Sequence, residues 1–225
     1  MYLPLTRSNE DLRRDEAYLN SALQQVDSLI KYCPLSSESR VLDFGCGQGR
    51  FAIGLAVRVP TLGSYCGIDT NPESVTWCKR WLEPAHENFS FVHLPAHNAC
   101  YNPTENSRQA LPTDDNSVDV VFMNSVFSHM LTDDITYYLG QFHRILNSNG
   151  VLYTTAFIED GVPDVEENPE GYLGKKSTGA LHRVRYEKAF FFKLLKDAGF
   201  EIVDFVHHKF KRTKQSLIVA RKCDA

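Results

Sequence analysis

The amino-acid sequence predicts an α/β fold built on a doubly wound, mainly parallel sheet. The first observation is segment 41–44, which has the composition of a buried strand and is followed by glycines at alternate positions, Gly45, Gly47 and Gly49. Glycine tolerates positive φ and has no Cβ, so the chain can turn sharply here and a ligand can lie against the backbone. The apolar run 51–56 then suits a packed helix. The second observation is segment 65–69, another strand that ends in an acid. In doubly wound folds an acid at this place hydrogen-bonds a ribose diol.

Together these residues resemble the class I S-adenosylmethionine (SAM)-dependent methyltransferases. The resemblance implies SAM as the cofactor and S-adenosyl-L-homocysteine (SAH) as its product. It implies that the three glycines shape the loop beneath the methionine part of SAM. It also implies that Asp43 lies near the SAM amino group and that Asp69 binds the ribose hydroxyls. The full set of cofactor-binding residues expected on this basis is Asp43, Gly45, Cys46, Gly47, Asp69, Thr70, Asn98 and Asn124.

The same resemblance implies the architecture of the whole chain. We expect one methyltransferase domain over residues 1–225, with a Rossmann-like sheet of seven strands in the order 3-2-1-4-5-7-6. The last strand is antiparallel, and helices cover both faces. Residues 1–34 are expected to form an N-terminal helical cap, and residues 158–185 a lid or substrate loop.

Composition excludes several function classes. The chain has 225 residues, 43% of them hydrophobic and 23% charged, which is ordinary for a globular domain. A formal charge of −4 gives no general field for binding nucleic acid. No apolar run in the sequence is long enough for a membrane span, and we do not expect the N-terminal residues, which are polar and charged after Leu5, to be a secretory signal. Six cysteines without a C-x-x-C pair favour reduced thiols, a cytoplasmic location and no metal site.

The first half of the chain follows the expected order of elements. Residues 8–31 show helical spacing of apolar side chains, with Ser8 as the N-cap and Asp11 three residues on. This helix either lies across the cofactor cleft or only packs on the sheet. A helix from 50 to 59, a strand from 63 to 69 and a helix that starts at Asn71 follow. The third strand covers residues 89–94.

The loop after the third strand contacts the adenine ring in the methyltransferases that this chain resembles. The acid that those enzymes commonly place there is missing, and Pro95 occupies roughly its position. Asn98 can both donate and accept hydrogen bonds, so it is the first candidate for the adenine contact, and His97 is the second.

The second half predicts a strand at 118–123, a helix from Thr132 to 149–150, and a strand at 151–157. The stretch 159–184 is polar and long, which indicates a lid or binding loop, or else a surface insertion. A helix at 186–198 and two strands at 200–206 and 215–220 complete the pattern, joined by a turn with four basic residues, Lys209, Lys211, Arg212 and Lys214. Such a turn is more often a solvated hairpin than a nucleic-acid patch.

His129 is the candidate catalytic base. It follows the fourth strand, and the ordinary pKa of histidine, about 6.5, suits a base at neutral pH. Alternatively it only caps its helix or packs there. His182, Glu159 and Asp160 are weaker candidates, and Arg183 and Arg185 would clamp an acidic acceptor or lie on the surface.

The function that follows is methyl transfer to a hydroxyl of a small molecule, a sugar or a natural product. The narrower resemblance is to bacterial methyltransferases of glycan and natural-product pathways. No metal, nucleic-acid or membrane partner is expected, and the protein is expected to be a monomer or homodimer. The alternatives are transfer to nitrogen or to a macromolecule, and a SAM-binding protein without turnover. An NAD-dependent oxidoreductase is disfavoured by the C-terminal strand pair and by the helix before the first strand.

Overall fold

The computed structural model describes residues 3–4, 14–99, 101–105, 107–174, 176–210 and 213–223. Its chain forms two compact units, Met1–Leu94 and Pro95–Ala225. Each unit is described separately.

The first unit holds a parallel three-stranded sheet in the order β3-β2-β1. Its strands are β1 (Arg40–Phe44), β2 (Ser64–Asp69) and β3 (Phe89–His93). Leu42 is in register with Cys66, and Cys66 with Ser90. Because β1 and β2 are parallel, both end at the same edge, where their terminal acids lie. The three strands predicted from the sequence are confirmed.

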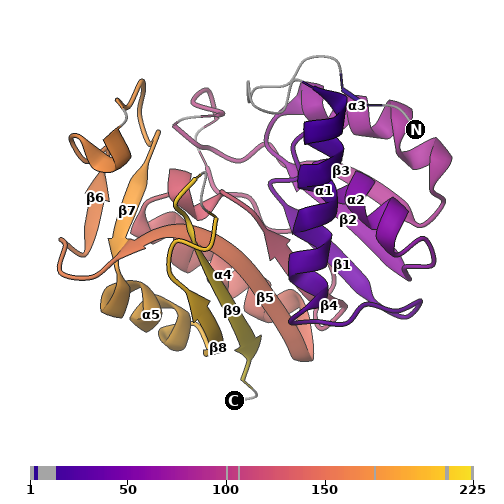
Figure 1. The fold of residues 1–225 in the computed structure, drawn as a ribbon. Helices are drawn as coiled ribbons and strands as arrows, with labels where there is room; N and C mark the ends of the chain where they lie inside the picture. Colours follow the sequence, from indigo (N-terminus) through magenta and orange to yellow (C-terminus); the bar gives the residue numbers. More distant parts are fainter. Residues whose placement is uncertain are drawn as a thin grey trace. The chain divides into compact units, whose positions relative to one another are not determined.

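Helices α1 (Asp15–Ile30), α2 (Arg50–Arg58) and α3 (Pro72–Trp81) accompany this sheet, with a short 3-10 turn, η2 (Glu83–Ala85). Figure 1 shows α1, in indigo, beside α2. Their approach is close, because a Cβ on Gly54 would lie 2.4 Å from the carbonyl oxygen of Ala22. The described part of α1 begins at Asp15, and the predicted cap at Ser8 and Asp11 lies outside the described residues.

The start of α3 follows its sequence signals. The Asn71 side chain accepts a 2.8 Å hydrogen bond from the backbone N–H of Ser74, and Pro72 occupies the first turn. Proline needs no hydrogen-bond partner there, and its φ suits a helix start.

The second unit holds β4 (Val118–Met123), β5 (Leu146–Glu159), β8 (Phe200–Val206) and β9 (Ser216–Lys222). Strands β4 and β5 are parallel, whereas β9 pairs antiparallel with both β5 and β8. The order β4-β5-β9-β8 is therefore the predicted order 4-5-7-6, with β9 in the place of the seventh strand. Helices α4 (Thr132–Ile145) and α5 (Lys188–Asp197) and the 3-10 turns η3 (Phe127–His129) and η4 (Tyr172–Gly174) belong to this unit.

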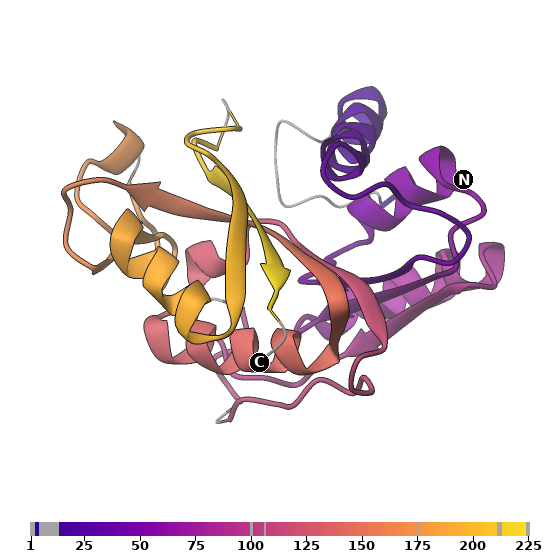
Figure 2. The same cartoon turned by 90° about the horizontal axis from the view of Figure 1, so that it is seen from below.

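Two expectations for this half need correction. The stretch 158–185 is not only a loop, because it contains β6 (Val165–Glu167) and β7 (Val184–Glu187), which pair with each other. The last residues of β5 pair with β7, so β5 continues past β9 to reach this small hairpin (Figures 1 and 2). Val184 and Tyr186 are buried and alternate with less buried neighbours, but four residues are too few to mark a strand in the sequence. Tyr186, predicted to begin the next helix, therefore lies in β7, and α5 begins at Lys188.

The second correction concerns the end of α4. The helix ends at Ile145 instead of at 149–150, since Leu146 is extended (φ −68°, ψ 139°) and pairs with Val118. The buried Leu146 side chain fits the sheet as well as a helix, so apolar spacing alone does not mark the boundary.

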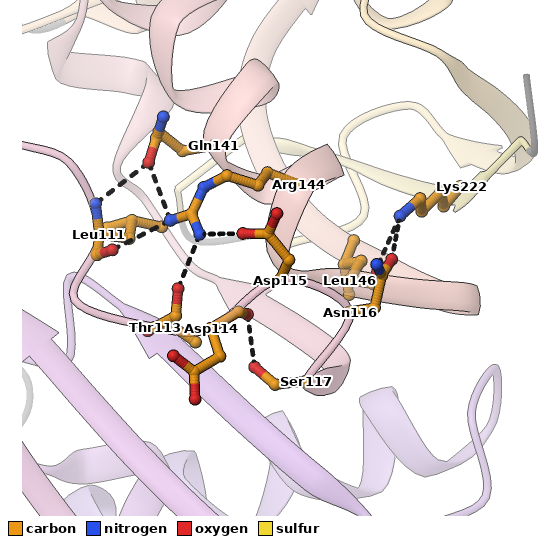
Figure 3. A network of polar contacts seen from close by, with 10 residues as sticks. All are labelled: Leu111, Thr113, Asp114, Asp115, Asn116, Ser117, Gln141, Arg144, Leu146 and Lys222. Atoms are coloured by element: carbon orange, nitrogen blue, oxygen red, sulfur yellow. Dashed lines mark hydrogen bonds and ion pairs between the residues drawn. The ribbon is translucent and has the colours of Figure 1, made fainter.

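Arg144, near the end of α4, fixes the loop that leads into β4 (Figure 3). Its guanidinium donates to the carbonyl oxygens of Leu111 (3.0 Å) and Thr113 (2.8 Å). It also pairs with the Asp115 carboxylate at 2.6 Å and donates to Gln141 Oε1 at 3.1 Å. One planar side chain thus binds several acceptors of one loop, in the fixed geometry of a guanidinium that a lysine ammonium lacks.

Candidate functional site

The glycine-rich turn after β1 is tied to the neighbouring strand. The backbone N–H groups of Gly45 and Cys46 donate to the carbonyl oxygen of Ile68, at 2.7 and 3.0 Å. Gly45, Gly47 and Gly49 have φ of +84°, +52° and +70°, in the left-handed region. The sharp turn predicted from the glycines is confirmed, and its left-handed backbone favours residues without a Cβ.

Two of these glycines face different surroundings. A Cβ on Gly49 would lie 2.5 Å from Leu82 Cδ1, so this glycine permits close packing of α3 and the turn. A Cβ on Gly47 would meet no atom of the structure within 4 Å. Gly47 therefore leaves open space beside the loop backbone, the condition for a ligand to lie against it.

Asp69 closes the loop from the end of β2. Its Oδ2 accepts a 2.7 Å hydrogen bond from the Gly47 N–H, and its Oδ1 accepts a 2.8 Å bond from the Asn71 N–H. Burial raises the pKa of Asp69 above its ordinary value of 3.8, although these two hydrogen bonds oppose the rise. Each carboxylate oxygen has a second lone pair, so Asp69 can still accept from ribose hydroxyls. That contact stays a prediction.

Asp43 is buried, with 2% of its surface exposed, and Tyr65 Oη donates a 2.7 Å hydrogen bond to its Oδ2. Burial raises the pKa of Asp43 to about 7, against the lowering effect of the Tyr65 hydrogen bond. Sequence reasoning missed Tyr65. Gly67, which pairs with Asp43, leaves room for this contact, because a Cβ on it would lie 2.9 Å from the Tyr65 hydroxyl oxygen.

Other expected cofactor residues of this unit have structural partners. Cys46 is buried, its Sγ contacts the carbonyl oxygen of Gly47 at 3.6 Å, and burial raises the pKa of its thiol. The carbonyl oxygen of Thr70 is 3.2 Å from His93 Nε2. Helix α1 reaches the same loop, where Tyr18 Oη donates to the carbonyl oxygen of Gln48 at 3.4 Å. The leading helix therefore packs on α2 and also contacts the glycine-rich turn.

The second unit places His129 at the end of η3, after β4. Its Nδ1 lies 2.9 Å from the carbonyl oxygen of Leu181, and its Nε2 lies 3.3 Å from Tyr101 Oη. A carbonyl can only accept, so Nδ1 carries the proton and Nε2 presents its lone pair. Burial lowers the pKa of His129 below its ordinary 6.5, the Leu181 contact opposes this, and the charges of His182 and Arg183 add to it. The lowered pKa favours the neutral imidazole at neutral pH, with the lone pair on Nε2.

Asn98 holds the loop that carries Tyr101 against this histidine. Its Nδ2 donates to the carbonyl oxygen of His129 at 2.8 Å, and its Oδ1 accepts from the Tyr101 N–H at 3.0 Å. The Tyr101 ring meets the imidazole edge-on, with centroids 5.1 Å apart, and is 57% exposed. Asn98 therefore positions this pair in the second unit, while its expected contact with adenine stays a prediction.

Asn124 borders a buried polar network behind the end of β4. The Thr155 hydroxyl accepts from the Ser125 N–H at 2.7 Å and donates to Gln215 Oε1 at 2.7 Å, with Asn124 Oδ1 farther away at 3.5 Å. Gln215 in turn donates to Ser125 Oγ at 2.7 Å. Ser125 has φ of +65°, a conformation that non-glycine residues rarely adopt. The network thus stabilises the left-handed backbone at Ser125, just after the carboxyl end of β4. Open α/β sheets bind their ligands at this edge.

The glycine-rich turn and its acids fit the cofactor that the sequence implies. Gly47 offers open backbone, and the carboxylates of Asp43 and Asp69 suit a ligand that combines positive charge with a ribose diol. In the described part of the chain, no helix is long and apolar enough to cross a membrane.

Comparison with known proteins gives a matching family, described as "Methyltransferase domain", over residues 42–154, which are half of the chain. Arsenite methyltransferase of Mus musculus is 28% identical over 176 residues, covering 74% of this chain. The match covers 46% of that enzyme, so the chain spans about half the length of this curated relative.

Solved structures share the fold. One is the 1,6-didemethyltoxoflavin-N1-methyltransferase of Burkholderia thailandensis with bound 1,6-didemethyltoxoflavin and SAH. It is 21% identical, with a TM-score of 0.60 over 93% of this chain and 80% of that one. Another is the [4+2]-cyclase SpnF, 18% identical, with a TM-score of 0.64 over 92% of this chain and 83% of that one. Identities this low show the fold alone.

Proposed function

Since the chain belongs to the methyltransferase domain family of class I SAM-dependent enzymes, we propose that it methylates a hydroxyl group of a small molecule. A sugar or a natural product is the acceptor class that we favour. The coarser activity, SAM-dependent methyl transfer, follows from the family. The choice of a hydroxyl rests on one observation, the geometry of His129.

A hydroxyl is a poor nucleophile at neutral pH, so its methylation gains from a base that removes the proton as the new bond forms. A positioned base contributes about 10²- to 10⁴-fold. His129 suits this role, because the Leu181 carbonyl favours a proton on Nδ1 and burial lowers the pKa of the ring, which favours its neutral form. The Tyr101 hydroxyl already lies 3.3 Å from Nε2, which is the contact that an acceptor hydroxyl would make.

The first unit would hold the cofactor. When bound, SAM supplies a methyl group activated by its sulfonium sulfur. In our proposal Gly45 and Gly47 let the ligand approach the backbone, Asp69 accepts from the ribose hydroxyls and Asp43 faces the amino group. Cys46 and Thr70 complete the proposed binding set in this unit, and the cofactor contacts expected of Asn98 and Asn124, which belong to the second unit, stay predictions.

The test is turnover with methyl-labelled SAM on two matched panels of small molecules, one with hydroxyl and one with amine acceptors on the same scaffolds. We expect label in the hydroxyl panel, formation of SAH in equal amount, and a large loss of turnover in His129→Gln with unchanged SAH affinity. Label confined to the amines would contradict O-methylation. SAH binding without label in either panel would favour a SAM-binding protein that does not methylate these compounds.

A further inference from the structure

A separate cluster of metal-ligating side chains lies in the second unit, at the end of β5. Glu159 is the last residue of β5, and His207 and His208 directly follow β8. His207 Nε2 lies 2.9 Å from Glu159 Oε2, and His208 Nε2 lies 2.9 Å from Glu159 Oε1. One ligand atom from each of the three residues lies within 4.8 Å of the other two.

The backbone at His208 explains how two consecutive histidines reach one carboxylate. Successive side chains of an extended strand point to opposite faces. His208 has φ of +46°, and the two imidazoles are stacked with centroids 3.8 Å apart. The His208 N–H donates to Ser216 Oγ at 3.2 Å, which anchors the turn on β9. The chain thus adopts a less favoured conformation that directs both rings to Glu159.

The carboxylate of Glu159 also accepts a hydrogen bond from a residue outside the cluster. Tyr172 Oη donates to Glu159 Oε1 at 2.6 Å, and the Arg185 guanidinium lies over the Tyr172 ring, 4.9 Å from its centroid. Burial raises the pKa of Glu159, but hydrogen bonds from Tyr172, His208 and His207 outweigh it and leave the pKa below its ordinary value. Outer hydrogen bonds of this kind orient carboxylate ligands in metal sites.

The three side chains of the cluster differ in their exposure to solvent. The Glu159 side chain is 17% exposed, whereas those of His208 and His207 are 31% and 47% exposed. An ion can therefore reach the imidazoles from solvent while the carboxylate stays fixed at the strand end.

We propose that Glu159, His207 and His208 bind a divalent transition-metal ion of the zinc type. Two imidazoles and one carboxylate select such ions over Mg²⁺ and Ca²⁺, which prefer oxygen ligands. Zinc bonds of about 2.0–2.1 Å in tetrahedral geometry place ligand atoms roughly 3.3 Å apart, so small side-chain rotations suffice. Three protein ligands leave a position for water or an oxygen of a small molecule.

The ion would join the end of β5 to the turn between β8 and β9, with Tyr172 of the 158–185 segment as the outer partner. This site is distinct from the groups assigned to methyl transfer, and its existence does not depend on the proposed function.

The test uses the full chain, stripped of metals with a chelator and titrated with Zn²⁺ in a calorimeter. We expect one zinc ion per chain and no saturable binding of Mg²⁺. Glu159→Gln, His207→Gln and His208→Asn should each weaken zinc binding by at least about tenfold, and Tyr172→Phe by about 10- to 100-fold. Asparagine is chosen at position 208 because it tolerates the left-handed conformation.

Control variants test whether other histidine or cysteine side chains bind the zinc, and a second control tests whether each variant is folded. His86→Gln removes a histidine of the first unit, Cys223→Ser removes an exposed thiol, and both should bind zinc as the wild type does. Every variant should keep the circular dichroism spectrum and the thermal unfolding midpoint of the metal-free wild type, which shows that it is folded. Co²⁺ should give visible absorption bands that are lost in the His207 and His208 variants. Wild-type protein without zinc binding, or equal binding by the cluster variants, would overturn the proposal.

Discussion

The phenol of Tyr65 donates a 2.7 Å hydrogen bond to the Asp43 carboxyl group inside the first unit. This contact joins β2 to the end of β1 directly before the glycine-rich turn. It also gives a buried acid a polar partner, although burial still raises the pKa of Asp43 to about 7. Two predictions follow from an acid that titrates near neutrality beside a proposed cationic ligand.

The first concerns stability. The unfolded chain ionises Asp43 near its ordinary pKa of 3.8, whereas the native state does so near 7. Between these values the native state holds more protons, so rising pH favours unfolding. We expect the free energy of unfolding of the wild type, minus that of Asp43→Asn, to fall as pH rises from about 4 to about 7. Urea titrations across this range measure it, and a constant difference would contradict the buried acid.

The second concerns the ligand. If Asp43 faces the amino group of SAM, binding favours the ionised carboxylate. We therefore expect SAH to bind more tightly as pH rises through about 7 and to release a proton on binding below that pH. Calorimetry in two buffers of different ionisation enthalpy measures the proton count. Asp43→Asn should release no proton when SAH binds. If the variant releases as many protons as the wild type, the group that titrates on binding is not Asp43.

Gly47 gives a test with a matched control. Gly47 and Gly161 both have positive φ (+52° and +69°), and a Cβ on either would meet no atom within 4 Å. Alanine at each position should cost about 1–2 kcal/mol of folding free energy for the left-handed conformation. Gly47→Ala should also lose SAH affinity, because its methyl group would occupy the proposed ligand space. Equal SAH affinity in both variants would place the ligand away from Gly47.

His129 predicts a pH profile. Because burial lowers its pKa below 6.5, the acid limb of the turnover profile should lie below pH 6.5. His129→Gln should lower kcat by about 10²- to 10⁴-fold. Tyr101→Phe should lower it less, because Nε2 keeps its lone pair. Nitrogen NMR should find the proton on Nδ1 at neutral pH, and a proton on Nε2 would exclude His129 as the base.

Arg144 predicts a loss of stability. Arg144→Ala would leave acceptors of the 111–115 loop unpaired (Figure 3) and should cost about 1–3 kcal/mol. Arg144→Lys keeps the positive charge but not the planar set of guanidinium donors, so we expect an intermediate loss of folding free energy. Urea unfolding measures both, and a lysine variant as stable as the wild type would mean that charge alone fixes the loop.

Periodic and special residues made most of the fold predictable. Buried strand 41–44, the alternate glycines and the Asn71-Pro72 helix start each have a local physical cause, and the structure confirms them. The hairpin of β6 and β7 was missed because its three- and four-residue strands are too short for a clear alternation.

The site residues were predictable only where neighbouring residues in the sequence indicate their place in the fold. Asp43 and Asp69 stand at strand ends, so their position follows from the parallel sheet. The partners Tyr65 and Leu181 were not predictable, because they meet Asp43 and His129 across 22 and 52 residues of sequence. The same reason hid the Glu159 cluster, whose histidines lie 48 and 49 residues farther along.

Calorimetric titration of the full chain with SAH tests the central claim most directly. We predict saturable, micromolar binding at one site per chain, unchanged by excess NAD and weakened in Gly47→Ala. Binding of NAD with no response to SAH would contradict the assignment of the glycine-rich turn to SAM.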